Sequence, residues 1–277
     1  MYFNFIRTKN EVLARYFEGF YIFQKEAADP DLQYTVFSSN HVILSIYRFA
    51  DCRIDQDRVE VVEQPGNQFL SLLTIAVETP LCCAYKGAVK EMSFCFKPLG
   101  FNHFVGDELR HYFQKGCFPF LPFPDFETEM QSILQEDDEA VMQERVENYW
   151  LSKMKSKGLA LLEKIVSRIQ EDNTTGIQEI AKELGVSRQH IVRLFDAHLC
   201  KSPSVFRKID RFRKTLHNRV AVLKEQDNLT ALTYESFFYD QSHLIRDFKS
   251  LTGMSPRKFF EGNRAFENGW INWFFPS

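Results

Sequence analysis

The chain has 277 residues, of which 44% are hydrophobic and 26% charged, and its formal net charge is -3 at pH 7. This length allows two domains with sizeable cores, and the composition is typical of a soluble globular protein. No apolar run reaches the ~20 residues that cross a bilayer, and the N-terminus lacks the features of a signal peptide. The six cysteines form no CxxC pair. We therefore expect free thiols in the reducing cytoplasm and no contact with a membrane.

The two halves of the chain differ in charge. Residues 1–150 hold 13 basic and 23 acidic side chains, a net charge of -10. Residues 151–264 hold 21 basic and 13 acidic side chains, a net charge of +8. This asymmetry predicts that only the C-terminal half meets a polyanion, although an uneven scatter of charge by chance is the alternative explanation. We expect a fragment from about residue 152 onward to bind DNA, with an affinity that falls as salt rises.

Residues 1–118 are predicted to form a mainly antiparallel β domain. Segments 35–49, 69–78 and 90–101 are rich in Val, Ile, Phe and Thr and are bounded by turn residues, as strands are. The apolar positions of segment 11–23 fit neither the helical nor the strand period, so that segment stays open between helix and strand.

Residues 119–155 are predicted to be a connecting, mainly helical segment. The proline-rich run at 118–126 is extended and apolar, so we expect it to lie along the domain surface. The acidic stretch 127–151 has the apolar stripes of one or two helices. Two interpretations of this stretch stand equally. It is either a dimerising or connecting helix, or a helix packed on its own domain.

Residues 156–262 are predicted to be an all-α domain, followed by an aromatic tail at 263–277. The segment HIVRLFDAHLCKSPSVF (190–206) recurs as HLIRDFKSLTGMSPRKF (243–259), with a constant offset of 53 residues. Such a repeat indicates two copies of one supersecondary unit. In each copy a short apolar helix and a tight turn precede a second helix, which is the layout of a helix-turn-helix.

In the first unit, Thr175 and Gln178 match a capping box at the start of a helix. Gly185 stands where a helix end needs a left-handed residue, and Ser187 stands at the N-cap of the next helix. The outward side chains of that second helix suit DNA reading, because Arg and Gln pair with guanine and adenine edges and an apolar side chain can touch a thymine methyl. The predicted base contacts of this unit are Arg188, Gln189, Val192 and Arg193.

In the second unit, Asp240 is the expected N-cap of a helix over 241–251, after a turn at 237–239 that is one residue longer than in the first. Val192 corresponds to Ile245 and Arg193 to Arg246. The predicted base contacts are Gln241, Ser242, Ile245 and Arg246. Across both units, the side chains predicted to contact DNA phosphates are Ser187, Lys201, Ser202, Arg207, Lys249 and Arg257.

A long helix over 203–225 is predicted to join the two units. Pro203 suits a first helical turn, and about 21 residues at ~1.5 Å each make a helix of ~32 Å. This length is close to the ~34 Å between successive major grooves on one face of B-DNA. One chain can therefore place both recognition helices in adjacent grooves.

The segments IAKELGVSRQHIVRLF (180–195) and YDQSHLIRDFKSLTGMSPRKFF (239–260) resemble the AraC/XylS family of bacterial transcription regulators. The resemblance covers about residues 157–262. The N-terminal half more weakly resembles the β-rich sensory or dimerisation domains of one branch of that family. Two departures concern turns: Cys200 replaces a usual Gly, and Thr233 and Phe237 replace Ala and Gly. We therefore expect the first unit to dominate specificity, because a bulky Phe237 strains a tight turn.

The residues point to no enzyme, no cofactor and no metal site. The cysteines lack the paired spacing of a zinc site, and His103 and His111 have no second close histidine. The resemblance implies a cytoplasmic α+β transcription regulator that binds double-stranded DNA, with RNA polymerase as a partner if it is an activator. A small-molecule effector and a homodimer are open roles of the N-terminal domain. The rival interpretation is a protein-interaction or non-specific DNA-binding protein with a degenerate second helix-turn-helix.

Overall fold

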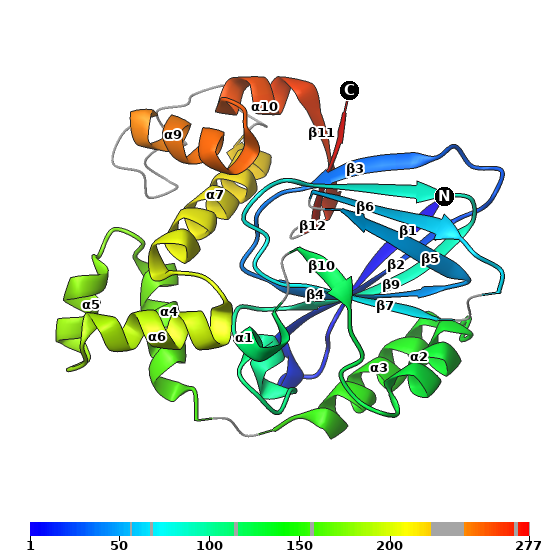
Figure 1. The fold of residues 1–277 in the computed structure, drawn as a ribbon, viewed down its shortest axis with the longest axis horizontal. Helices are drawn as coiled ribbons and strands as arrows, with labels where there is room; N and C mark the ends of the chain where they lie inside the picture. Colours follow the sequence, from blue (N-terminus) through cyan, green and yellow to red (C-terminus); the bar gives the residue numbers. More distant parts are fainter. Residues whose placement is uncertain are drawn as a thin grey trace. The chain divides into compact units, whose positions relative to one another are not determined.

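The computed structural model describes residues 1–55, 57–66, 69–113, 116–155, 158–222, 241–268 and 271–276, and at 218–222, 241, 261–268 and 271–276 it describes the backbone alone (Figure 1). Its contacts divide the chain into two compact units. The β unit comprises residues 1–34, 41–76 and 81–157, and the helical unit comprises residues 35–40, 77–80 and 158–277.

The β unit is built mainly on antiparallel pairing, as predicted. One sheet has the strand order β1-β2-β9-β4-β7-β10, and its register is antiparallel throughout the pairs that are described. The other sheet contains the order β3-β8-β6-β5, in which β5 and β6 are antiparallel and β6 and β8 are parallel. The strands are β1 (Tyr2–Arg7), β2 (Phe17–Lys25), β3 (Leu32–Val36), β4 (Val42–Arg48), β5 (Ala50–Asp55), β6 (Arg58–Glu63), β7 (Leu70–Thr74), β8 (Leu81–Lys86), β9 (Val89–Phe96) and β10 (Cys117–Pro119).

Short helices accompany the sheets of the β unit. The ambiguous segment 11–23 forms a 3₁₀ turn and then the start of β2, which explains why it matches neither period along its whole length. The helices are η1 (Leu13–Arg15), η2 (Gly100–His103), α1 (Leu109–Tyr112), α2 (Phe126–Leu134) and α3 (Glu139–Lys153).

The acidic helix α3 packs on its own unit. Its Trp150 is fully buried. The indole ring centroid lies 4.8 Å from that of Phe96, 5.4 Å from that of Phe94 and 5.2 Å from that of Phe104. Such edge-to-face aromatic contacts stabilise a core beyond their apolar area. Of the two interpretations of the acidic stretch, packing on its own domain agrees with these contacts.

The helical unit carries the repeated segments. Helix α4 (Ala160–Glu171) has an apolar stripe that is buried at Leu162, Ile165, Val166 and Ile169. The joining helix begins at Pro203, as predicted, and is described as far as Val222. The turn with Phe237 and the N-cap Asp240 lie outside the described residues. The helices are α4 (Ala160–Glu171), α5 (Ile177–Glu183), α6 (Arg188–Leu199), α7 (Pro203–Val222), α9 (Gln241–Thr252) and α10 (Pro256–Gly262).

The aromatic tail forms a hairpin of β11 (Asn263–Asn268) and β12 (Ile271–Pro276). Within the helical unit, β12 pairs with the end of β3, so that Trp273 faces Val36 and Phe274 faces Thr35. In the part of the chain that the structure describes, no helix is both long and apolar enough to cross a bilayer.

Residues 35–40, which precede β4, belong to the core of the helical unit. Phe37 is 1% exposed and packs among Ile209, Phe212 and Phe259. The centroid of its ring lies 4.9 Å from that of the Phe259 ring. Arg213 of α7 donates from Nε to the carbonyl of Ser38 (2.7 Å) and from Nη2 to the carbonyl of Phe37 (2.6 Å). The predicted strand 35–49 is therefore divided: Thr35 and Val36 end β3, Phe37 and Ser38 contact α7, and β4 begins at Val42.

Candidate nucleic-acid interface

The start of α5 differs from the predicted capping box. Gly176 is the N-cap and offers no side chain. The Thr175 hydroxyl instead donates to Asp172 Oδ2 (2.5 Å) and accepts from Arg168 Nη2 (3.2 Å). Thr175 therefore stands one residue before the N-cap, and its hydroxyl is held by Asp172 and Arg168. The hydrogen bonds from Thr174 and Thr175 hold the pKa of Asp172 well below its ordinary value.

The turn between α5 and α6 has the predicted residues in the predicted roles. Gly185 has a left-handed φ of 67°. Its N–H donates to the carbonyl of Lys182 (3.3 Å), and the Val186 N–H donates to the carbonyl of Ala181 (2.9 Å), which together form a Schellman motif. Ser187 Oγ accepts from the His190 N–H (3.1 Å) and caps α6. These bonds fix the direction in which α6 leaves the turn.

Helix α6 separates an apolar face from a polar one. Ile191, Phe195 and Leu199 are buried, and the Phe195 ring meets that of Phe206 on α7 at 5.6 Å. Val192 is 39% exposed. The structure brings the four predicted base contacts of the first unit together on the exposed face, where they line one open hollow: Arg188, Gln189, Val192 and Arg193.

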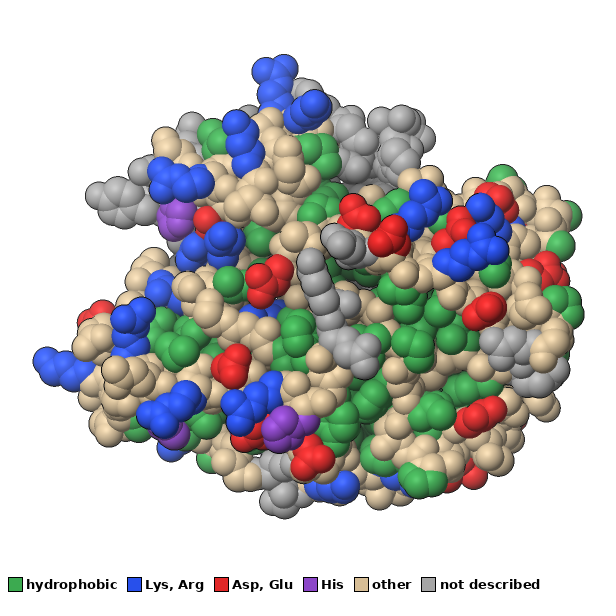
Figure 2. Space-filling view, viewed as in Figure 1, with side chains coloured by type: hydrophobic (Ala, Val, Ile, Leu, Met, Phe, Trp, Pro, Cys, Tyr) green, Lys and Arg blue, Asp and Glu red, His purple; other side chains and the backbone are tan. Residues whose placement is uncertain are grey.

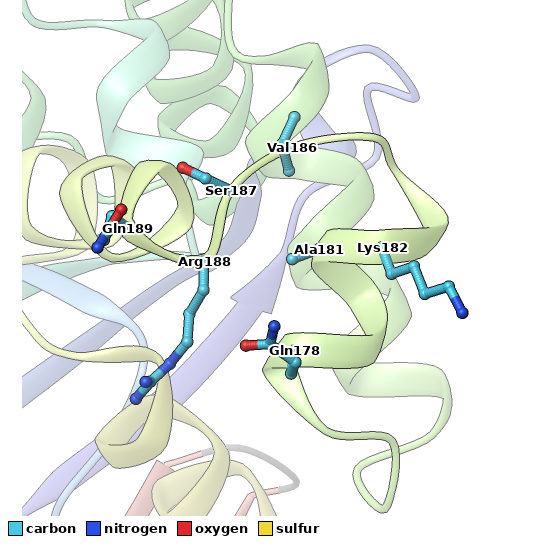
Figure 3. Close-up of a pocket in the computed structure, with 7 residues that line it drawn as sticks. All are labelled: Gln178, Ala181, Lys182, Val186, Ser187, Arg188 and Gln189. Carbon is cyan, nitrogen blue, oxygen red and sulfur yellow. The ribbon is translucent and has the colours of Figure 1, made fainter.

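A second hollow lies between α5 and α6. In Figure 3, Gln178 extends from α5 and Arg188 from α6 on facing sides of this hollow, while the Lys182 side chain points away from α6. Gln178 and Lys182 are exposed and were not predicted to take part. Their spacing of four residues, on the helix before Ser187, is the signal that identifies them as candidates. The hollow is lined by Gln178, Ala181, Lys182, Val186, Ser187, Arg188 and Gln189.

Helix α9 repeats the two faces of α6. Leu244, Phe248 and Leu251 are buried and pack against α7. Ile245 is 37% exposed, which is close to the exposure of its counterpart Val192. The side chain of Gln241 lies outside the described residues. The predicted base and phosphate contacts of α9 that are described are all exposed: Ser242, Ile245, Arg246 and Lys249.

The repeat also holds at the helices that follow. Pro203 and Pro256 each begin a helix, because proline lacks the N–H that a first turn leaves unpaired. Phe206 and Phe259 are both fully buried. The two predicted copies of the unit therefore match beyond their recognition helices. Pro203 and Phe206 follow α6 as Pro256 and Phe259 follow α9.

Two predicted phosphate contacts, Lys201 and Arg207, bind backbone carbonyls of the helical unit. Lys201 is 5% exposed, and its Nζ donates to the carbonyl of Ser39 (3.0 Å) and to Asn40 Oδ1 (3.3 Å). Burial lowers the pKa of Lys201 to about 8. Arg207 is half-buried and donates from Nη2 to the carbonyl of Thr174 (3.3 Å). Both cations bind backbone carbonyls and hold elements of the unit together, which does not fit a phosphate contact.

The other predicted phosphate contacts are exposed: Ser187, Ser202, Lys249 and Arg257. Figure 2 shows Lys and Arg side chains gathered over α5, α6, α9 and α10. This distribution agrees with the excess of basic residues in the C-terminal half. It gives the helical unit a surface suited to a polyanion.

The cysteines are free thiols, as predicted. Burial raises the pKa of Cys83 and Cys95 far above that of an exposed thiol, so neither is poised to act as a nucleophile or metal ligand. Among the described residues, no group of three or more His, Cys, Asp and Glu side chains could hold a metal ion.

Comparisons with known proteins give one family model and several solved structures. A family model for a helix-turn-helix domain matches residues 178–262, which run from α5 to α10. No curated protein matches the chain. Among solved structures, ToxT from Vibrio cholerae is 10% identical, with 87% of this chain and 97% of ToxT covered at a TM-score of 0.48. Unsaturated fatty acid bound ToxT from Vibrio cholerae strain SCE256 is 13% identical, with 92% and 96% covered at 0.48. The AraC-like transcriptional activator CuxR is 14% identical, with 83% and 70% covered at 0.23.

Proposed function

We propose that this chain, which is a DNA-binding transcription regulator with an AraC-type helix-turn-helix domain at residues 178–262, recognises specific DNA sequences through the exposed faces of α6 and α9. The observation that carries this proposal is the geometry of α6. Four side chains able to read bases line one hollow, while Ile191, Phe195 and Leu199 of the same helix are buried. A helix with this division lays its polar face in the major groove.

Each exposed side chain of α6 has a distinct capacity for readout. Arg188 and Arg193 can each donate two hydrogen bonds to guanine O6 and N7, and Gln189 can pair with adenine N6 and N7. Val192 can touch a thymine methyl. Because Ile191 and Phe195 anchor the helix from its other face, these groups project from a rigid backbone. Rigid placement favours specific readout over non-specific attraction.

The length of the joining helix α7 supports a role for α9 as the second recognition helix. The 20 residues of α7 span ~30 Å at ~1.5 Å per residue, close to the ~34 Å between adjacent major grooves. We infer that α6 and α9 enter successive grooves of one duplex. Lys249 and Arg257, both exposed, would then add phosphate contacts beside the second groove, and Gln178 and Lys182 would do so beside the first.

Site selection with the full chain tests the proposal. Duplexes enriched from a random pool should share a defined sequence. Replacing Arg193 with Ala should weaken binding to the enriched duplex by ~1–3 kcal/mol and relax preference at one or two base pairs. The matched substitution Arg246→Ala should reduce the specific-to-scrambled ratio less, if the first unit dominates.

The control removes a charge of the same sign away from both recognition helices. Lys164 is exposed on α4, so Lys164→Ala should leave the sequence preference unchanged. If Arg193→Ala binds enriched and scrambled duplexes with wild-type affinities, the assignment of α6 as the reader is wrong. The rival role, non-specific DNA binding or protein interaction, would then be favoured.

We further infer that the β unit senses a signal or dimerises, in the cytoplasm, and that RNA polymerase is a partner if the chain activates transcription. Support comes from the opposite charge of the two halves and from the separate, closely packed core of the β unit. Sedimentation velocity of the full chain across micromolar concentrations tests dimerisation. A single monomeric species throughout would remove the dimer and leave sensing as the role of this unit.

A further inference from the structure

One arginine joins the two reading units. Arg211 lies near the middle of α7 and donates from Nη1 to Asn173 Oδ1 at 2.8 Å. The same guanidinium donates to Asp247 Oδ2, from Nη2 at 2.7 Å and from Nε at 3.3 Å. Asn173 lies in the turn that leads into α5, and Asp247 follows Arg246 on α9. A single planar group thus contacts an element of each helix-turn-helix.

Asn173, the first partner of Arg211, is bound closely to α7. Asn173 is almost fully buried, and its Nδ2 donates to Asp210 Oδ2 (3.0 Å) and to the carbonyl of Arg207 (3.3 Å). Its own carbonyl accepts from Arg207 Nη2. Both the side chain and the backbone of this residue are therefore bound to α7. The turn that begins the first reading unit cannot shift along α7 without breaking these bonds.

Asp247, the second partner of Arg211, fixes the angle of α9 relative to α7. Asp247 is buried, whereas its neighbour Arg246 is exposed, and the side chains of Arg211 and Asp247 are 10% and 9% exposed. His243, one turn earlier, lies 3.5 Å from the same carboxylate oxygen. The apolar contacts between α9 and α7, such as Phe248 with Phe212 at 5.0 Å, supply attraction that depends little on direction. A shielded, two-nitrogen contact to one carboxylate depends strongly on direction.

We propose that Arg211 is a positioning residue that fixes the distance and angle between α6 and α9, so that the chain discriminates DNA by the spacing between its two half-sites. The inference rests on the proposed function, because spacing has meaning only if both helices read bases. It goes beyond that function in assigning the spacing preference to one side chain that does not face the DNA-reading surface.

The variant Arg211→Lys separates positioning from charge. Lysine keeps a positive charge beside Asp247, but its single nitrogen lacks the planar fork that reaches Asn173 on one side and Asp247 on the other. Asn173→Ala serves as a second variant: it removes the contact with Arg211, together with the bonds from Asn173 Nδ2 to Asp210 and Arg207, and leaves the contact between Arg211 and Asp247 in place. The control is Glu183→Gln, which removes an exposed ion pair with Arg168 (3.4 Å) in the same unit and touches neither α7 nor α9.

The probes are the duplex enriched by the wild-type chain and versions with two base pairs inserted between the halves. Such an insertion turns one half by about 70° relative to the other, since B-DNA turns once in about 10.5 base pairs. Wild type and Glu183→Gln should lose about ten-fold or more in affinity on insertion. Arg211→Lys and Asn173→Ala should lose less than about three-fold, while their affinity for a duplex holding only the α6 half stays within about two-fold of wild type.

Three results would overturn the inference. They are an unchanged insertion penalty in both variants, an equal loss of affinity for the single half, and a wild-type chain indifferent to the insertion. Failure to enrich any sequence would instead refute the proposed function. A second measurement needs no DNA and settles the case if a variant binds poorly. Nitroxide labels on unnatural amino acids at the exposed positions 192 and 245 should report a wider distance distribution in Arg211→Lys than in wild type, and equal widths would contradict the proposal.

Discussion

Removing the aromatic side chain of Phe37 should destabilise the helical unit, although this residue precedes the helices of that unit by more than a hundred positions in the chain. Phe37 is 1% exposed and its ring lies 4.9 Å from that of Phe259 and 6.5 Å from that of Phe212. Truncating a fully buried phenylalanine to alanine typically costs ~3–5 kcal/mol, from lost apolar burial and the cavity that remains. A domain has only ~5–15 kcal/mol of stability, so this loss would open α7 and α9 often.

Hydrogen exchange on the full chain can localise the effect. In Phe37→Ala, amides of α7 and α9 should exchange faster, while those of β2 and β9 keep their wild-type protection. The matched control is Phe94→Ala, which removes a fully buried ring of the β unit and should give the reverse distribution. If Phe37→Ala loosens the strands and leaves α7 protected, residues 35–40 do not belong to the core of the helical unit.

The same contacts bear on the fragment from residue 152 onward. It would lack Phe37 and the two carbonyls that accept from Arg213. Burial lowers the pKa of Arg213 to about 10, which reflects the cost of keeping this cation away from water. Without residues 35–40 the cation loses described partners and the apolar core loses a ring. The fragment should therefore unfold at lower temperature than the helical unit of the full chain, and bind DNA only where it remains folded.

Three further outcomes are expected. Gly253 and Cys200 occupy matching left-handed positions. In urea unfolding, Gly253→Ala should therefore lower the stability by ~1 kcal/mol, and Cys200→Gly should be ~1 kcal/mol more stable than Cys200→Ala. Equal stabilities would contradict this expectation. Binding of the enriched duplex should weaken steeply with salt. For each phosphate neutralised, the association constant should fall by about 0.9 logarithmic unit per ten-fold rise in salt concentration, and a flat response would exclude phosphate contacts. Finally, Lys201 is charged only below about pH 8 in the folded chain but up to its ordinary pKa when unfolded. The unfolded state thus holds more protons between pH 8 and 10, so the stability of wild type relative to Lys201→Met should rise there by at most ~1.4 kcal/mol per pH unit, and a constant difference would refute it.

The sequence predicts best the features that depend on local periodicity. Phe195 and Phe248 are both fully buried, and Val192 and Ile245 are both exposed, because the helical period alone assigns each to a face. The turn at Gly185 is equally local, since only a residue that tolerates positive φ can end α5 in this way. The exposed faces of both recognition helices therefore follow from the order of residues alone.

Features that depend on distant segments could not be derived in this way. Lys201 stands beside Ser202 at the start of a basic helix, which suggests a phosphate contact, and only the return of residues 35–40 shows why it is buried. The pairing of β12 with the end of β3 is of the same kind. The capping box at Thr175 was wrong for a different reason, because α5 starts one residue later, with Gly176 as its N-cap, and the Thr175 hydroxyl donates to Asp172.

The two copies of the repeat differ at the joint after each recognition helix. Gly253 ends α9 with a φ of 74°, whereas Cys200 ends α6 with a φ of 55°, a conformation that costs a residue with a Cβ about 1–2 kcal/mol. The next residue, Lys201, is fixed by the carbonyl of Ser39 and the side chain of Asn40, and Asn40 Nδ2 donates to the carbonyl of Phe206 on α7 (3.0 Å). These bonds hold the strained turn in place. The strain therefore lies between α6 and α7, at a joint that Ser39 and Asn40 secure, so a change at these two residues would act first on the direction of α6.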